Sequence, residues 1–373
     1  MLFVAAYGAA SSSAGQPKWK PIPVRHAAAG GGWFQAYGWA SGRVWFGVGD
    51  AQDVIWSAKV QGGTLTSFVS TPSTDEQVGQ STLIGSSLVD GDAAAPLLAS
   101  GKVGPAAPIP GNPAQTAHDQ LSAPFGLTVR AGVTIGSRTI WAVAGTGVLA
   151  ACCTDSGQAS DLSSILVTGR QINPQFFVRI GVDAHGRLWL AWSEYAKPPL
   201  VTLHIAQLDP ATLKALSSKN YSGPAVHGGG AGSQLGDDFT LACVDSCRLV
   251  FGMFRRPGIF SWGGDAAPTK VAPASGNTFL LAAGAAGDKL VLAFAKGSPD
   301  YGWQLSTSEA SPTGAGFHVV ATSAVPQAKP HPNEVWNAAE LRGMLTPSGF
   351  VLLAGYPLSG RTLQPLEATV LHG

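Results

Sequence analysis

Short apolar strands separated by turn residues follow one another along the whole chain. A turn residue followed by bulky apolar side chains recurs, as at residues 42–48, 186–192 and 288–294. Each such strand follows another apolar strand across a tight turn, as residues 176–182 precede the turn at 183–186. Helical patterns are poor, because no apolar period of 3.6 residues persists and Gly or Pro interrupts most segments. The pattern therefore predicts an all-β chain.

The second strand of each pair returns at a nearly regular interval of about 51 residues. The anchors, each the first strongly apolar residue of a copy, are Val44, Leu97, Ile140, Leu188, Leu249, Leu290 and Val351. A third strand and a more polar fourth strand follow most anchors. Four antiparallel strands per unit, repeated about seven times, predict a single β-propeller of about seven four-stranded blades.

Burial and residue size support the same architecture. Near-continuous apolar strands indicate burial on both faces, as in a blade packed between two neighbours. Small residues such as Gly181, Gly343 and Ala282 recur in the first strands, where we expect inner strands to crowd toward the ring axis. A pair of β-sandwiches also uses short strands and is the alternative, but the period favours the propeller.

The ends of the chain bear on how the ring closes. The last unit, from residue 336, lacks a strand, and residues 17–24, with three prolines, are predicted to supply it as an outermost strand. The unit at 78–122 is the weakest, with a Pro-rich extended loop, so six blades remain an alternative. We expect one propeller domain over residues 17–373, preceded at 1–16 by a truncated signal-like or disordered tail.

Composition excludes several classes of function. The 373 residues carry a net charge of +1 and only 12% are charged, which provides no basic surface for nucleic acid or anionic lipid. No apolar run is long enough for a membrane span. The 45% hydrophobic content and 11 Trp favour a packed fold despite 48 Gly and 26 Pro. We expect a monomer that needs no cofactor.

The four cysteines bear on the cellular compartment. Cys243 and Cys247 flank a three-residue link that is typical of a hairpin tip, which predicts a disulfide. Free thiols, or a zinc site shared with Cys152 and Cys153, are the alternatives, and the adjacent pair itself either forms a strained bridge or stays reduced. Low charge and a disulfide favour a secreted or cell-surface protein, with the periplasm as an alternative.

Three arginines are the sharpest chemical signal. Arg130, Arg179 and Arg342 fall within predicted first strands of three different units. Arginine is seldom buried unless paired, so the three could form a cationic cup for a carboxylate or sulfate near the axis. The alternative is that each bridges adjacent blades through an Asp or Glu. Arg255 and Tyr356, on links that we expect at the same face, are added as ligand-binding candidates.

Residues 182–192 resemble repeats of bacterial sialidase-like (BNR-type) β-propellers, which often carry Asp-x-x-Gly-(Arg/Lys)-aliphatic-Trp at this turn. Residues 298–305 match the family's Asp box, Ser-x-Asp-x-Gly-x-x-Trp, except that Leu305 replaces the last Trp. Our strand assignment puts this segment between second and third strands, whereas the family's box lies between third and fourth. The resemblance implies the propeller fold and, more weakly, a carbohydrate ligand.

The resemblance also implies candidate catalytic residues. Sialidase-like enzymes bind a carboxylate with an arginine triad and use a tyrosine nucleophile assisted by a glutamate. The candidates in this sequence are Tyr195, Tyr301, Glu194, Glu334 and Asp300, and no motif selects among them.

No motif assigns a reaction to the chain. The eight histidines show no metal-binding spacing, and nucleophile-elbow, EF-hand and dinucleotide fingerprints are missing from the sequence. We therefore expect a secreted propeller that binds a glycan or another extracellular ligand at its axial face without catalysis. A sialidase-like hydrolase or lyase for an anionic glycan, and a protein-interaction scaffold with a plugged channel, are the alternatives. The sequence leaves open whether the chain is an enzyme.

Overall fold

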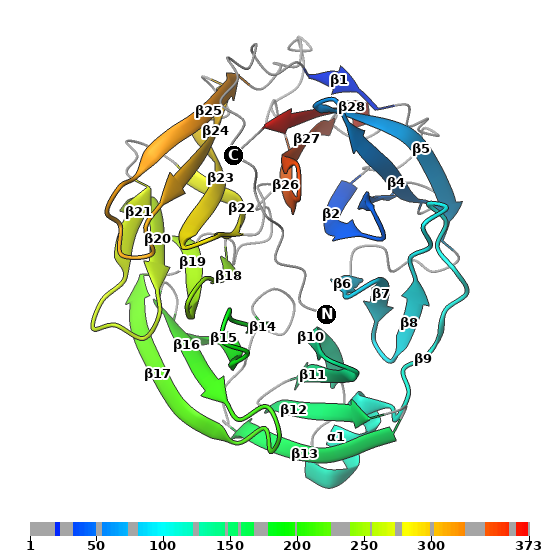
Figure 1. The fold of residues 1–373 in the computed structure, drawn as a ribbon, viewed down its shortest axis with the longest axis vertical. Coiled ribbons are helices and arrows are strands. Elements are labelled where there is room, and N and C mark those ends of the chain that lie inside the picture. Colours follow the sequence, from blue (N-terminus) through cyan, green and yellow to red (C-terminus); the bar gives the residue numbers. More distant parts are fainter. Residues whose placement is uncertain are drawn as a thin grey trace.

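The computed structural model shows a ring of small β-sheets that the chain visits in sequence order (Figure 1). It describes residues 19–22, 33–49, 54–73, 81–121, 127–145, 148–155, 158–167, 178–197, 200–224, 239–253, 256–272, 278–298, 302–324, 340–357 and 363–371. Within these ranges, the strands form seven four-stranded antiparallel sheets, which we call blades 1 to 7.

Blades 1 to 4 each use four consecutive strands, which run in order from the innermost to the outermost. Blade 1 is β2 (Trp33–Ala40), β3 (Arg43–Gly49), β4 (Val54–Gln61) and β5 (Thr64–Pro72). Blade 2 is β6 (Thr82–Ile84), β7 (Ser87–Asp90), β8 (Ala93–Pro96) and β9 (Ala107–Pro108). Blade 3 is β10 (Thr128–Ile135), β11 (Arg138–Gly145), β12 (Val148–Asp155) and β13 (Gln158–Val167). Blade 4 is β14 (Val178–Val182), β15 (Leu188–Lys197), β16 (Leu200–Leu208) and β17 (Ala215–Pro224).

Blades 5 and 6 follow the same order, and blade 7 joins the two ends of the chain. Blade 5 is β18 (Phe239–Cys243), β19 (Cys247–Met253), β20 (Arg256–Trp262) and β21 (Thr269–Ala272). Blade 6 is β22 (Thr278–Ala286), β23 (Lys289–Ser298), β24 (Gly302–Ala310) and β25 (His318–Ala324). Blade 7 is β26 (Glu340–Thr346), β27 (Gly349–Pro357), β28 (Leu363–Leu371) and, outermost, β1 (Lys20–Pro21).

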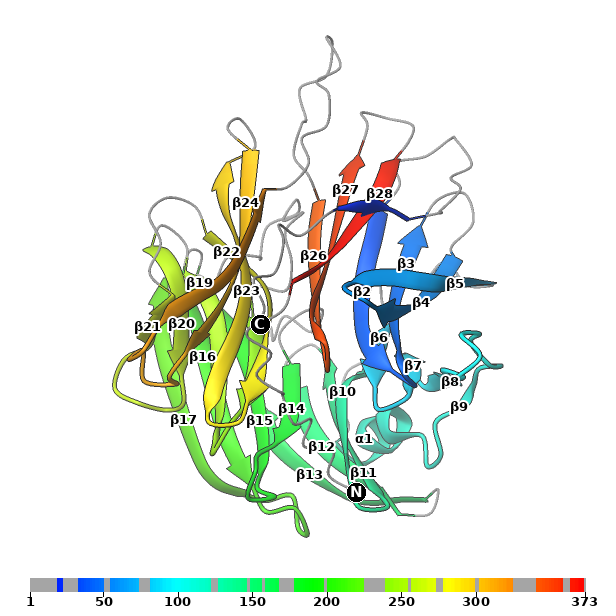
Figure 2. The ribbon, with the colours of Figure 1, turned by 45° about the horizontal axis from the view of Figure 1, so that its top comes forward.

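The innermost strands close the ring. The strands β2, β6, β10, β14, β18, β22 and β26 each contact the next, and β26 contacts β2 again. Figure 2 shows the blades standing side by side around this circle. The predicted all-β propeller is confirmed, with six blades of full size and a reduced blade 2 whose strands have two to four residues.

The N-terminal segment closes the ring from outside, as predicted. Lys20 pairs with Ala368 of β28, which makes β1 the outermost strand of blade 7. The Trp19 indole donates a hydrogen bond of 2.9 Å to the carbonyl oxygen of Ala324 in blade 6. Ile22 is buried in a cluster that blade 1 shares with blade 7. Residues 19–22 therefore contact blades 1, 6 and 7 and link them at the point where the ring closes.

Blade 2 departs from the predicted Pro-rich loop in two ways. Residues 97–104 lie against the outer strand of blade 1, where Lys102 Nζ donates to the Ser70 carbonyl (2.7 Å) and Val103 N donates to Thr71 Oγ1 (3.1 Å). A helix, α1 (Pro113–Leu121), follows and packs against blade 3. The sequence did not predict this helix, because it is short and its apolar stripe is mostly alanine.

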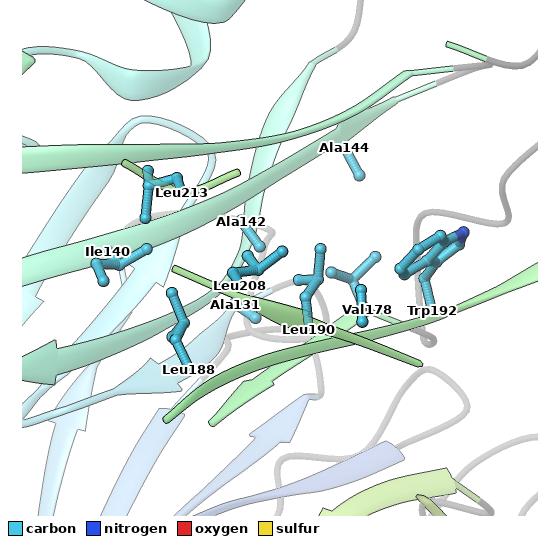
Figure 3. Close-up of a cluster of buried hydrophobic side chains, with 11 residues drawn as sticks. Ala131, Ile140, Ala142, Ala144, Val178, Leu188, Leu190, Trp192, Leu208 and Leu213 are labelled. Atoms are coloured by element: carbon cyan, nitrogen blue, oxygen red, sulfur yellow. The ribbon is translucent and has the colours of Figure 1, made fainter. Parts of the chain in front are cut away.

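Crowding between neighbouring inner strands explains their small residues. A Cβ added at Gly343 would lie 3.0 Å from the backbone of Leu281 in the next blade. A Cβ at Gly181 would lie 2.9 Å from Cys243 Sγ, again across a blade boundary. The apolar core is accordingly divided among the seams between blades, and Figure 3 shows the cluster between blades 3 and 4.

Candidate functional site

The ring has two faces, and the sequence-predicted site residues belong mainly to one. Turns between first and second strands lie on one face, which we call the hairpin face. Links from second to third strands and from blade to blade lie on the other, the link face. Four site candidates fall outside the described residues, namely Asp300, Tyr301, Glu334 and Arg255. Three more are known by their backbone alone, namely Glu194 and Tyr195 on β15 and Tyr356 on β27.

The three arginines of the predicted cup all lie on innermost strands and are half-buried. Arg130 is on β10 and Arg179 on β14, and these strands are neighbours. Arg342 is on β26, three blades away from β14 in the order of the ring. Two of the three residues therefore belong to adjacent blades, and the third comes from a distant part of the circle.

The register puts these arginines opposite nearly the same position of the repeat, counted from the anchor of each blade. Arg179 pairs with Ala191, the third residue after the anchor of its blade. Arg342 pairs with Leu353, the second residue after its anchor. Successive strand residues alternate between faces, so Arg179 and Arg342 are not equivalent positions of the repeat. Each guanidinium donates a hydrogen bond of 3.1 Å to the carbonyl of the preceding residue.

Arg130 sits in a β-bulge. Val129 and Ala131 pair with consecutive residues of β11, and Arg130 between them has no partner in the ladder. Its Nε is buried and makes no hydrogen bond. Burial lowers the pKa of Arg130, and the charge of Asp90 in blade 2 opposes this shift. This attraction across the seam is the inter-blade arrangement that the alternative for the arginines predicted.

An aromatic stack lies in blade 4, one pair along the ladder from Arg179. Trp192 pairs with Val178 in the ladder and stacks on His204 of β16, with ring centroids 4.7 Å apart and planes 3° from parallel. Trp192 is only 2% exposed, and its Nε1 makes no hydrogen bond. Figure 3 shows this indole at the end of the cluster, next to Val178 and Ala144. Sequence reasoning missed His204, which only the cross-strand register brings opposite Trp192.

The motif that carries the sialidase-like resemblance, within residues 182–192, stabilises a turn on the hairpin face. Asp183 Oδ1 accepts hydrogen bonds from the backbone N–H groups of His185 (2.9 Å) and Arg187 (3.0 Å). Its Oδ2 accepts from Arg187 Nε (2.6 Å) and Trp189 Nε1 (2.8 Å). Burial alone would raise the pKa of Asp183, but these hydrogen bonds outweigh burial and lower it. The carboxylate is therefore fully used in holding the turn.

The Asp-box-like segment lies where the strand pattern predicted it. Ser298 ends β23 and pairs with Gly302 at the start of β24, so the segment joins second and third strands. This position differs from that of the box in sialidase-like propellers. The structure supports a β-propeller and no sialidase-specific family.

The predicted disulfide is confirmed. Cys243 and Cys247 are joined and are direct partners across the β18–β19 hairpin. Disulfide sulfurs are not thiolate ligands, which removes this pair from the alternative zinc site. Cys152 and Cys153 are consecutive residues of β12, where the backbone alone is described. Within the described ranges, no group of three or more His, Cys, Asp or Glu side chains could hold a metal ion.

Two further observations concern partners. A pocket of about 10 Å³, room for roughly one water molecule, lies at the closing seam, next to Lys20, Leu65 and Phe68. It is much smaller than most small-molecule sites and lies at the outer strands of blades 7 and 1, whereas the arginines lie on innermost strands. No helix in the described part of the chain is long and apolar enough to cross a membrane.

Comparisons with known proteins give only distant similarities. No family model and no curated protein matches the chain. Among solved structures, a prolyl endopeptidase is 13% identical with a TM-score of 0.42 over 91% of this chain, which spans only 48% of that protein. A Synechocystis apocarotenoid oxygenase mutant is 13% identical (TM-score 0.36, 99% and 81% covered). An AofleA mutant from Arthrobotrys oligospora is 10% identical (TM-score 0.39, 85% and 94% covered). These distant similarities carry no argument about a ligand or a reaction.

Proposed function

We propose that this β-propeller is a binding module for an anionic ligand of the acidic-glycan class, without catalysis of its own. The ligand lies at the axial end of the inner strands and contacts Arg130, Arg179 and Arg342. The observation that supports the proposal is that three half-buried arginines lie on innermost strands, opposite nearly the same position of the repeat. Inner strands border the ring axis, and we propose that the three guanidinium groups extend from these strands toward a ligand near the axis.

The chemistry of arginine favours a carboxylate or sulfate over a neutral sugar. A guanidinium offers a planar set of donors that fits either anion, and charge-assisted hydrogen bonds of this kind are the stronger ones. Arg130 and Arg179 come from adjacent blades and form the core of the proposed site. Arg342 approaches from the opposite part of the ring and would contact a second acidic or hydroxyl group. Arg255 and Tyr356 extend this proposal toward the link face.

The proposal includes an exported location. The Cys243–Cys247 disulfide supports it, because stable disulfides form mainly in oxidising compartments. Acidic glycans of cell surfaces and extracellular matrix are abundant there.

Titration calorimetry with sialic acid, glucuronate and sulfated disaccharides tests the proposed site. We expect saturable binding of at least one of these ligands by the unaltered chain. Arg130→Gln and Arg179→Gln should each weaken it about tenfold or more, since each removes a charge-assisted contact. Arg138→Gln is the matched control, because Arg138 lies on the adjacent strand at the hairpin face and donates to the Pro210 carbonyl (2.6 Å).

Three results would contradict the proposal. One is the lack of binding by any acidic sugar, and another is equal binding by Arg130→Gln and Arg138→Gln variants with matching thermal stability. The third is turnover of a fluorogenic acidic glycoside, since it would assign the chain to a hydrolase and replace the non-catalytic interpretation.

A further inference from the structure

The outermost strands of the blades differ in how their free edges are protected. A free edge presents unpaired N–H and C=O groups, which proteins protect with charges, prolines, short strands or covering segments. The strands β1 and β9 have two residues each, one of them a proline. The strand β21 has four residues, including an exposed lysine, Lys270. The long strand β17 has an exposed Lys219 at its centre and ends in Pro224.

Two other outer strands are covered by neighbouring segments. The side chain of Lys102 reaches the Ser70 carbonyl of β5, and the backbone N–H of Val103 bonds to Thr71 of the same strand. Helix α1 packs against β13. Six of the seven described outer strands therefore carry a recognisable protection.

Among the described residues, β25 lacks these protections apart from Trp19 at its end, and its one irregularity is a bulge at Val320. It has seven residues and contains no Lys, Arg, Asp, Glu or Pro. Val319 and Val320 are 47% and 42% exposed, and they are two of the four large apolar side chains most exposed in the described part of the chain. Trp19 covers only the last two residues, through hydrogen bonds to Ser323 Oγ (3.1 Å) and the Ala324 carbonyl (2.9 Å).

We propose that this edge binds an extended, uncharged peptide segment of a partner protein, rich in β-branched residues, as an additional strand of blade 6. Main-chain hydrogen bonds to the free edge would supply affinity, and contacts with Val319 and Val320 would supply selectivity. The partner segment is uncharged because β25 has no Lys, Arg, Asp or Glu, and its one histidine, His318, already lies 3.5 Å from Glu309 of β24. The surface is on the rim of the ring, apart from the axial arginines, so it is independent of the proposed anion site.

The shape of β25 favours a peptide over a second copy of the chain. Val319 pairs with Ser308 and Ala321 with Thr307, so Val320 is an extra residue in a bulge. A bulge increases the local twist, which opposes edge-to-edge contact between two rigid sheets but not a flexible peptide that follows the twist. Seven residues span roughly 23 Å. Pairing two such edges would bury much less than the approximately 1,200 Å² that stable protein pairs need.

Fluorescence anisotropy with a labelled peptide tests the edge. The probe is a capped heptapeptide of alternating Thr and Val with a lysine tail for solubility, and the matched control peptide is N-methylated at alternate residues. We expect saturable binding of the probe by the full chain and none of the N-methylated peptide, which lacks main-chain donors. Val320→Lys should weaken binding at least tenfold. Leu216→Lys, which alters an exposed apolar residue on β17, should change it less than twofold.

Each other outcome overturns the proposal. Equal binding by Val320→Lys, or equal binding of the N-methylated peptide, would show that β25 does not pair with the probe. A lack of saturable binding up to about 1 mM would show that the edge is closed to strands. A concentration-dependent dimer that Val320→Lys abolishes, measured by light scattering, would assign the edge to a second copy of the chain. Thermal unfolding of both lysine variants confirms that they remain folded.

Discussion

Blades 1 and 4 carry an arginine at the same position of the repeat, directly before the anchor, and use it in opposite ways. In blade 4 the carboxylate is buried: Asp183 has no exposed side-chain surface, whereas Arg187 beside it is 40% exposed. In blade 1 the cation is buried, since Arg43 is 2% exposed and no carboxylate of the described residues pairs with it. Four of the seven anchors directly follow a basic residue, and in blades 1 and 4 the surroundings decide which charge is buried.

Neutral oxygens stabilise Arg43 in place of a carboxylate. Its Nε donates to Ser57 Oγ (3.0 Å) and its Nη2 to the Ser67 carbonyl. Ser57 in turn donates to the Gly101 carbonyl of blade 2 (2.8 Å). Burial lowers the pKa of Arg43. The uncompensated cation therefore depends on close packing at the joint between blades 1 and 2.

Blade 5 lies between these extremes. Arg248, also directly before its anchor, is 9% exposed, and its Nε donates to Ser261 Oγ (2.8 Å) as Arg43 does to Ser57. Its Nη2 bonds to Asp265 at 2.5 Å, and the Asp265 side chain is 54% exposed. The three arginines form a series in which the carboxylate partner is buried, then exposed, then replaced by neutral groups.

The largest effect is expected at the buried carboxylate. Asp183→Asn removes the charge and replaces one of the two accepting oxygens by an NH2 donor, so that two of the four hydrogen bonds are lost. We therefore expect a loss of about 3 kcal/mol in the free energy of unfolding. The folded-state pKa of Asp183 is lowered, so its contribution is present above the unfolded-state pKa and lost as pH falls through the folded value. In urea denaturation, the difference in unfolding free energy between the unaltered protein and Asp183→Asn should become smaller below about pH 4. A constant gap across this pH range would contradict the role of the charge.

A smaller loss is expected where packing replaces the carboxylate. Gly101 has φ +93°, and a Cβ there would lie 2.8 Å from Arg43 Nε. Gly101→Ala should therefore cost about 2 kcal/mol, from backbone strain and displacement of the guanidinium. Gly91→Ala is the control, since Gly91 has φ +56° with nothing within 4 Å, and it should cost about 1 kcal/mol. If the two variants lost equal free energy of unfolding in chemical denaturation, close packing against Arg43 would not contribute to the cost of Gly101→Ala.

The smallest effect is expected at the exposed carboxylate. Asp265→Asn should cost about 1 kcal/mol or less, because more than half of this side chain is in water and screening reduces the pair's contribution. High salt should lower the stability of the unaltered protein toward that of the variant. A loss as large as that of Asp183→Asn would break the proposed series.

Sequence reasoning reached part of the candidate site. It placed Arg130, Arg179 and Arg342 on first strands, because apolar strands with a regular period reveal their order in the blade. It did not predict the bulge at Arg130, since one extra residue leaves no mark on an apolar run. His204 was also missed, because its stacking on Trp192 depends on the register between strands that are separated by a link.

The sequence by itself determined the ring of antiparallel blades, the closing strand at the N-terminus and the Cys243–Cys247 hairpin. The ring follows from the strand periodicity, and the Cys243–Cys247 pair follows from its place at a tight turn. The closing strand follows because the last blade would otherwise expose an uncovered edge. Only the tertiary structure decided the reduced form of blade 2, the helix α1 and the partner of each repeated arginine. Those outcomes depend on side chains and carbonyls that neighbouring blades bring together, and no local pattern encodes such contacts.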